Sequence, residues 1–329
     1  MLISQTPLRI SLAGGGTDLP GYYTENDGVV VSTAIDKYLY VMVKDRFDDL
    51  IYVDYSKKEI VHSINEIQHD LVREAAKLTN MTNGFEVMML ADIPSEGSGL
   101  GSSSSLTVGL LNAFYQHQGI LVTSEQLARE ACHIEIDVLK RPIGRQDQYI
   151  AAYGGLKTFT FYKDHNVEVR EIEMDTISKR KLGSNLLLFF TNSTRIASSI
   201  LEEQSKNVKN TLRYHNVIRD LAYSTRDALL RLDIDEVGHN LKENWEMKKH
   251  LAENVSNPDI EKMHDTSMRA GALGAKISGA GGGGFLLVYC ERHLQDKLRK
   301  AMKEYRELPF LLEKFGSRII FNQTRYDIK

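Results

Sequence analysis

A run of glycines and serines at residues 93–105, with the sequence IPSEGSGLGSSSS, has the residue types that bind phosphate groups. Glycines let a backbone approach an anion closely, and the free amides and dipole at the start of a helix attract negative charge. A helix cap needs only one side chain, so four consecutive serines favour a functional role over a purely structural one. Serine hydroxyls can also coordinate Mg²⁺. The residues expected to bind phosphates are Gly97, Gly99, Leu100, Gly101, Ser102, Ser103 and Ser104.

Other common phosphate-binding patterns do not fit the chain. It has no G-x-x-x-x-G-K-[ST], and Gly279, Gly281 and Gly284 fit G-x-G-x-x-G only ahead of a predicted strand, where a dinucleotide site requires a helix. The H-R-D and D-F-G motifs of protein kinases are missing. His133 and Glu135 resemble the start of a zinc deaminase site but lack its P-C-x-x-C partner. These classes of enzyme are therefore excluded.

Length and charge indicate a two-lobed protein with a small-molecule partner. A chain of 329 residues exceeds what one hydrophobic core usually fills, so two lobes with a cleft are expected. A net charge of −3, with no basic cluster, argues against nucleic-acid and membrane partners. Cys132 and Cys290 lie in apolar segments and predict buried thiols in a reducing compartment. Because the N-terminus lacks the pattern of a signal peptide, the protein is expected in the cytoplasm.

The elements that must position the glycine-serine loop begin with strands, predicted at 29–32, 38–44 and 51–54. Helices are predicted at 106–117 and 123–140, the second opened by a Thr123 and Gln126 capping box. The next segments are a strand at 156–162 and then a polar passage at 163–181, where we place the boundary between the lobes.

The second half predicts mostly helices around a few strands. Its expected segments are a strand at 186–191, helices from 198 to 271, a glycine-rich loop at 279–284, a strand at 285–290, a helix at 294–308 and a strand at 318–322. The pattern predicts an α+β fold with an N-terminal lobe at 1–180 and a C-terminal lobe at 181–329.

Three ordered motifs resemble those of the GHMP kinases, a family that includes galactokinase, homoserine kinase and the mevalonate kinases. They are PLRISLAGGGTDLP at residues 7–20, the glycine-serine loop at 93–105 and KISGAGGGGF at residues 276–285. The resemblance implies the two-lobed GHMP fold, with a ribosomal protein S5 domain 2-like N-terminal lobe and a ferredoxin-like C-terminal lobe. It also implies ATP and Mg²⁺ as cofactors, bound between the lobes.

The resemblance further assigns roles to individual residues. Ser103 looks like the serine that contacts Mg²⁺, with Ser102 and Ser104 as near alternatives. Glu135 lies twelve residues before Asp147 and looks like the second metal ligand, with Glu130 and Asp137 as alternatives. Asp147 lies seven residues before Gly154, as the family's acceptor-site aspartate does, and Arg9 stands where the family has a cation near the transferred phosphate. Such an arrangement suits phosphoryl transfer, which depends on positioning and charge stabilisation.

The first motif also bears on the substrate. Galactokinases have G-E-H-T-D where this chain has Gly14-Gly15-Gly16-Thr17-Asp18, so the chain resembles instead the kinases that phosphorylate D-glycero-D-manno-heptose 7-phosphate at C1, and the fucokinases. The expected product is heptose 1,7-bisphosphate, for GDP-heptose and surface polysaccharide synthesis. Residues expected at the substrate are Gly15, Gly16, Thr17, Asp18, Arg145, Gly281 and Gly282.

Lys37, Arg141 and Arg145 are candidate contacts for a sugar phosphate, although exposure to solvent explains their positions equally well.

Two alternatives to the heptose kinase stay open. The acceptor could instead be fucose or another hexose, or the chain could be a sugar sensor without turnover. Retention of Arg9, Ser103, Glu135 and Asp147 favours an enzyme.

Overall fold

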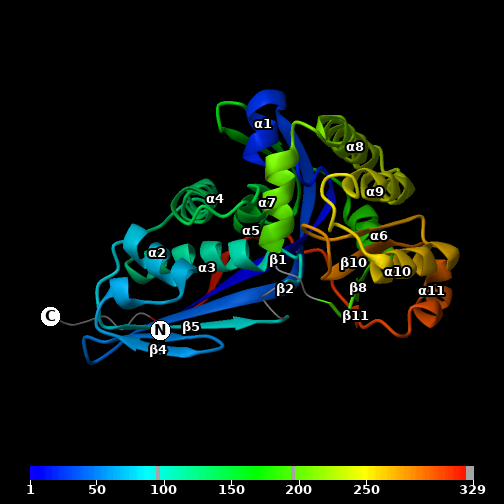
Figure 1. Ribbon diagram of the computed structural model, residues 1–329. Helices are drawn as coiled ribbons and strands as arrows, with labels where there is room; N and C mark the ends of the chain where they lie inside the picture. The colour runs from blue at the N-terminus through cyan, green and yellow to red at the C-terminus, as the bar shows by residue number, and fades with distance from the viewer. Residues whose placement is uncertain (94–96, 194–196, 324–329) are drawn as a thin grey trace.

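The computed structural model describes residues 1–93, 97–193 and 197–323, in which two sheets are surrounded by helices (Figure 1). The larger sheet has eight described strands, in the order β12-β1-β2-β5-β3-β4, with β6 paired to β2 and β7 to β6. Their bounds are β1 (Leu2–Ala13), β2 (Gly28–Asp45), β3 (Ile51–Asp54), β4 (Lys58–Val61), β5 (Phe85–Ala91), β6 (Leu156–Phe161), β7 (Val167–Glu171) and β12 (Arg318–Asn322). The first half of β2 pairs with β6 and its second half with β5, while β1 runs alongside both halves.

Helix α3 (Ser102–His117) is the central helix of the larger sheet. It contacts β1, β2, α2, α4 and α5, and most of its residues are buried. A helix that is apolar on all sides is expected at such a position. The other helices of this part are α1 (Pro20–Asn26), α2 (Asp70–Leu78), α4 (Ser124–Cys132) and α5 (Gln146–Tyr153), with a 3₁₀ turn at Ile64–Glu66.

The smaller sheet has four described strands in the antiparallel order β11-β8-β10-β9, and it lies on the right in Figure 1. Its strands are β8 (Leu186–Phe190), β9 (Gly274–Ile277), β10 (Phe285–Tyr289) and β11 (Glu307–Leu308). The helices of this part are α6 (Thr176–Asn185), α7 (Ala197–Asn207), α8 (Leu212–Leu230), α9 (Ile234–Lys248), α10 (Pro258–Arg269) and α11 (Gln295–Ala301), with a 3₁₀ turn at Arg292–Leu294.

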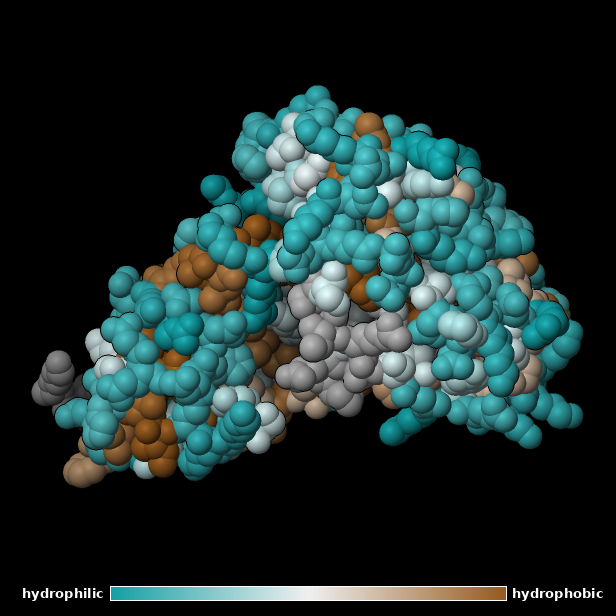
Figure 2. Space-filling view, viewed as in Figure 1, coloured by the Kyte–Doolittle hydropathy of each residue, from teal (hydrophilic) through white to brown (hydrophobic). Residues whose placement is uncertain are grey.

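One buried apolar cluster joins the two sheets. It contains Leu8 and Leu12 of β1, Leu188 and Leu287 of the smaller sheet, and Leu241 of α9. The lobes therefore share a packed interface that fixes how their loops face each other. Hydrophilic residues cover most of the face seen in Figure 2. Among the described residues, no helix combines the length and apolar character needed to cross a membrane.

The α+β prediction is confirmed, and the differences from the sequence expectations are local. The strands expected at 29–32 and 38–44 are a single strand, β2, which stays paired to β1 across a bulge near Pro7. The polar passage at 163–181 contains β7 and the start of α6, because Val167 and Val169 pack against the core of the larger sheet and Asp175 caps α6. The helix expected at 294–308 is shorter, since α11 ends at Ala301. Strands β1, β5 and β9 were not among the predicted segments.

The helix expected at 123–140 changes type partway along. The α-helix ends at Cys132, and His133–Val138 continues as a π-helix, with the Leu139 amide donating to the Ile134 carbonyl at 2.9 Å. Such insertions re-aim side chains and are frequent at functional sites. Here the wider turn holds Glu135 fully inside the protein.

After β11 the chain returns from the smaller sheet to the larger one. The Gly155 amide donates to Glu313, and the Ser317 amide donates to Ala151, at 3.1 and 2.9 Å. β12 then pairs with the start of β1. We keep the proposed division at residue 180, which falls within α6, with the addition that residues 318–322 belong to the larger sheet.

Gly316 tests how tightly this returning segment is held. A Cβ at Gly316 would lie 2.1 Å from the Ala152 carbonyl oxygen, so Gly316→Ala should lower the free energy of unfolding by about 2–3 kcal/mol through overpacking. Urea unfolding measures the change. Gly119→Ala is the control, because Gly119 has a positive φ but no neighbour within 4 Å, and should cost only about 1 kcal/mol. A Gly316 variant no less stable than the Gly119 variant would contradict the close packing.

Candidate active site

A cavity of about 530 Å³ lies where the three glycine-rich motifs meet. The first motif contributes Arg9, Gly15, Gly16 and Asp18 to its wall, and the glycine-serine loop contributes residues from Gly97 to Ser104. Gly279 comes from the third motif, and α9 adds two polar residues, Asn244 and Lys248. The cavity thus brings together segments that are far apart in the sequence.

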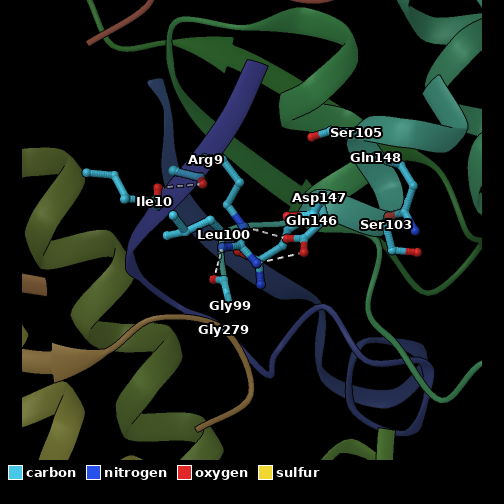
Figure 3. A network of polar contacts seen from close by, with 12 residues as sticks. Arg9, Ile10, Gly99, Leu100, Ser103, Ser105, Gln146, Asp147, Gln148 and Gly279 are labelled. Atoms are coloured by element: carbon cyan, nitrogen blue, oxygen red, sulfur yellow. Dashed lines mark hydrogen bonds and ion pairs between the residues drawn. The ribbon is translucent and has the colours of Figure 1, made fainter. Parts of the chain in front are cut away.

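Arg9 and Asp147 form a bidentate ion pair at this cavity (Figure 3). Arg9 Nε donates to Asp147 Oδ1 and Arg9 Nη2 to Oδ2, both at 2.6 Å, and Arg9 Nη1 donates to the Gly99 carbonyl at 2.7 Å. A bidentate pair of this kind fixes both side chains in one orientation. Strand β1 places Arg9, and the first turn of α5 places Asp147.

The glycine-serine loop opens the N-terminus of α3 toward the cavity. Gly99 and Gly101 have φ of +72° and +81°, and a Cβ at Gly101 would lie 3.2 Å from Arg9 Cγ and 3.3 Å from Asp147 Oδ2. No side chain among the described residues caps α3, so the amides of its first turn are free to bind an anion. The loop therefore fits a nucleotide's phosphates, although residues 94–96 lie outside the described residues.

Behind the loop, Glu135 is fully buried and joined to Ser103. Ser103 Oγ donates to Glu135 Oε1 at 2.5 Å, and Gln148 Nε2 donates to Oε2 at 2.8 Å. Burial raises the pKa of Glu135, while hydrogen bonds from Ser103 and Ser104 and the charge of Arg141 oppose that rise. Arg141 Nη1 contacts both Ser103 Oγ, at 2.5 Å, and Glu135 Oε1, at 3.3 Å. The positively charged guanidinium group of Arg141 already contacts Ser103 Oγ and Glu135 Oε1, so these two oxygens fit a divalent cation.

The wall contributed by the first motif is built around Asp18, which is 2% exposed. Asp18 accepts hydrogen bonds from the Gly16 and Gln146 amides at 3.0 and 3.1 Å. Burial raises the pKa of Asp18, and the Gln146 amide opposes the rise. Two polar atoms of the same wall, Ser11 Oγ and Gln146 Oε1, are buried without a hydrogen-bond partner in the described structure. Unpartnered polar atoms beside a cavity suit a ligand rich in hydroxyl groups.

The C-terminal lobe contributes a cluster of donors that the sequence reasoning did not identify. Lys248 and Lys276 are 6% and 3% exposed, and Asn244 precedes Lys248 by one helical turn on α9. Burial lowers the pKa of Lys248 to about 7, and it lowers the pKa of Lys276 well below the usual range. The available signals in the sequence were a lysine between two apolar residues, Ala275 and Ile277, and the four-residue spacing of Asn244 and Lys248.

Several residues expected at the phosphates or at the substrate lie away from the cavity wall in the described structure. Thr17 Oγ1 donates to the Gly14 and Val29 carbonyls, so it shapes the first motif. Arg145 donates to the His165 carbonyl at 2.6 Å and lies over the Tyr23 ring. The others are Leu100, Gly281, Gly282 and Lys37. Leu100 is buried, the Gly282 amide donates to Val255, and Lys37 is paired with Asp36.

Comparisons with known proteins agree with these motifs. The model of the GHMP kinases N terminal domain matches residues 54–155, and the model of the GHMP kinases C terminal domain matches residues 225–307. A D-glycero-alpha-D-manno-heptose 7-phosphate kinase of Campylobacter jejuni is 31% identical over 92% of this chain and 93% of its own length.

Two further relatives extend the comparison. The crystal structure of a D-glycero-D-manno-heptose 1-phosphate kinase from Bacteroides thetaiotaomicron superposes with a TM-score of 0.83 at 25% identity, covering 98% of this chain and all of that one. An L-fucokinase/L-fucose-1-P guanylyltransferase of Bacteroides fragilis is 28% identical over 91% of this chain, which spans only 36% of that longer protein. The chain belongs to the GHMP kinase family and has its two-lobed α+β fold.

Proposed function

We propose that the protein transfers the γ-phosphoryl group of ATP to the anomeric C1 hydroxyl of D-glycero-D-manno-heptose 7-phosphate, giving heptose 1,7-bisphosphate. The Arg9–Asp147 pair, held against the glycine-serine loop in the cavity, is the observation that carries the proposal of phosphoryl transfer. The relative that acts on a heptose 7-phosphate supports the choice of acceptor. The product would enter GDP-heptose and surface polysaccharide synthesis in the cytoplasm.

The nucleotide's phosphates would lie along the glycine-serine loop, where Gly99 and Gly101 leave room and the first turn of α3 offers free amides. Ser103 and Glu135 would hold Mg²⁺, which when bound neutralises charge on the β- and γ-phosphates. Arg141 would then lose its contacts with these two oxygens and keep its contact with Asp70. Asp70 Oδ2 accepts a hydrogen bond from Arg141 Nη2 at 2.8 Å.

The reaction forms a bond between the C1 hydroxyl oxygen and the γ-phosphorus and breaks the bond to the β–γ bridging oxygen, whose electron pair leaves with ADP. Asp147 would orient the hydroxyl and take its proton, which then passes to solvent. Arg9 holds the carboxylate in place and lies where it would stabilise charge on the transferred group. Asp18, Gly15 and Gly16 would contact the sugar.

Asp147→Asn should lower kcat about 10³-fold and leave ATP affinity within about threefold, because it removes the proton acceptor and spares the phosphate loop. Coupled ADP-release kinetics and calorimetric titration with ATP measure the two effects. Asp48→Asn is the matched control, since Asp48 also accepts a bidentate contact from an arginine, Arg46, away from the cavity. Near-normal turnover of the Asp147 variant would remove this residue from the reaction.

Arg9→Lys should lower kcat about 10²-fold with little change in acceptor KM, because lysine keeps the charge but cannot make the bidentate contact. Steady-state kinetics at saturating ATP separate the two constants. Arg46→Lys is the control, because Arg46 makes a similar bidentate contact to Asp48 away from the cavity. An unchanged kcat for Arg9→Lys would exclude Arg9 from stabilising the transition state.

Magnesium-dependent ADP release across an acceptor panel tests the function as a whole. The panel contains D-glycero-D-manno-heptose 7-phosphate, the unphosphorylated heptose, mannose, fucose and galactose. Release should be fastest with the heptose 7-phosphate. A preference for fucose or another free sugar would keep the kinase and discard this acceptor, and ATP binding without turnover on any acceptor would favour a sensor.

A further inference from the structure

Three hydrogen-bond donors of the C-terminal lobe meet at the cavity without an anionic partner. They are the Lys248 amine, the Lys276 amine and the Asn244 amide, all more than nine-tenths buried and all at the cavity wall. Among the residues that the structure describes, neither lysine forms an ion pair with a carboxylate. Buried ammonium groups normally have such a partner, because removing a charge from water is costly.

The acceptors that these lysines do have are neutral. Lys276 Nζ donates to the Asn244 Oδ1 at 3.0 Å and to the Leu12 carbonyl at 3.2 Å. Lys248 Nζ donates to the Gly279 carbonyl and lies 3.4 Å from the Ile277 carbonyl. Because Asn244 Oδ1 faces Lys276, its Nδ2 is left as a donor, and this buried atom has no partner in the described structure.

The charges nearest the lysines leave the cluster with excess positive charge. Arg9 and Lys248 both disfavour the charged form of Lys276, so the cationic groups repel one another. Asp18 and Asp147 favour the charged form of Lys248 electrostatically, without an ion pair to it, and Asp147 is already paired with Arg9. Without an anion, burial therefore holds the pKa of both lysines down. An anion at the cluster would favour their charged forms.

We propose that Lys248, Lys276 and Asn244 form the subsite that binds the acceptor's own phosphate group. The inference rests on the proposed function and deepens it, because it places the 7-phosphate in the C-terminal lobe. The nucleotide's phosphates have a separate place, at the glycine-serine loop and the first turn of α3. Lys276 Nζ instead donates to the carbonyl of Leu12. Leu12 lies three residues before Gly15, which belongs to the wall proposed to contact the sugar. Lys276 thus lies at the sugar side of the cavity, and Lys248 lies beside Gly279, where the third motif meets the glycine-serine loop.

Lys276→Met is the direct test, measured beside wild type with heptose 7-phosphate and with unphosphorylated heptose. The variant should raise KM for the heptose 7-phosphate about 30-fold or more, which corresponds to the loss of one charge-assisted hydrogen bond. KM for the unphosphorylated heptose and for ATP should stay within about threefold. Lys248→Met should act in the same direction. Lys242→Met is the control, since Lys242 is exposed on the same helix.

Stability separates this role from a structural one. Replacing a buried amine that has no carboxylate partner with an apolar side chain should raise the melting temperature of the free Lys276→Met protein, whereas a lysine needed for folding would lower it. Asn244→Asp provides a second variant of nearly the same shape. Its carboxylate would pair with Lys276, stabilise the free protein and compete with the acceptor's phosphate, so KM for the heptose 7-phosphate should again rise.

The outcomes distinguish failure of this inference from failure of the proposed function. Wild-type protein that does not phosphorylate heptose 7-phosphate would overturn the proposed function and this subsite with it. Wild-type turnover combined with unchanged acceptor KM in Lys276→Met and Asn244→Asp would overturn the subsite alone. A raised KM for ATP, or an equal loss with both heptoses, would assign the lysines to the transferred phosphate and also overturn it.

Discussion

The backbones of Gly99 and Gly279 touch where the glycine-serine loop meets the third motif, and the geometry of the cavity depends on this contact. A Cβ at Gly99 would lie 2.4 Å from the Ser278 carbonyl oxygen, and one at Gly279 would lie 2.6 Å from Gly99 Cα. Both residues also have a positive φ, so only glycine satisfies the two constraints together. On either side of the contact, the Gly99 carbonyl accepts from Arg9 and the Gly279 carbonyl accepts from Lys248. This close approach of two backbone segments therefore positions Arg9 of one lobe and Lys248 of the other around the same cavity.

The cavity concentrates charges that are unfavourable for the folded protein. At its wall, Asp18 is a buried carboxyl group with a raised pKa, and Lys248 and Lys276 are buried amines with lowered ones; Glu135, behind the glycine-serine loop and outside the wall, also has a raised pKa. Each shift records a cost of desolvation that ordinary packing would avoid. Folded proteins keep such groups mainly where they bind ligands or react, and they compensate with stable cores elsewhere. The apolar cluster that joins β1 to the smaller sheet supplies this support here.

Much of the fold and part of the site followed from local pattern. Strands β3 and β12 have the predicted bounds, and Arg9, Ser103 and Asp147, which the resemblance to the GHMP kinases singled out, line one cavity. The π-helix at Glu135 could not be predicted, because its wider turn depends on tertiary contacts with Ser103 and Gln148 rather than on local preference. The role of Lys276 was also hidden, since its lack of a carboxylate partner is a property of neighbours from β1 and α9.

The chain crosses between its two sheets twice, through α6 and again after β11. These crossings lie side by side, because a Cβ at Gly183 of α6 would meet the Leu312 side chain at 3.2 Å. Leu182 of α6 is buried in the apolar cluster that joins the two sheets, and Leu312 packs against it, so both tethers add to the interface that fixes the lobes relative to each other. The site therefore has its two walls aligned before any ligand binds, and little binding energy is lost in bringing donor and acceptor groups into register.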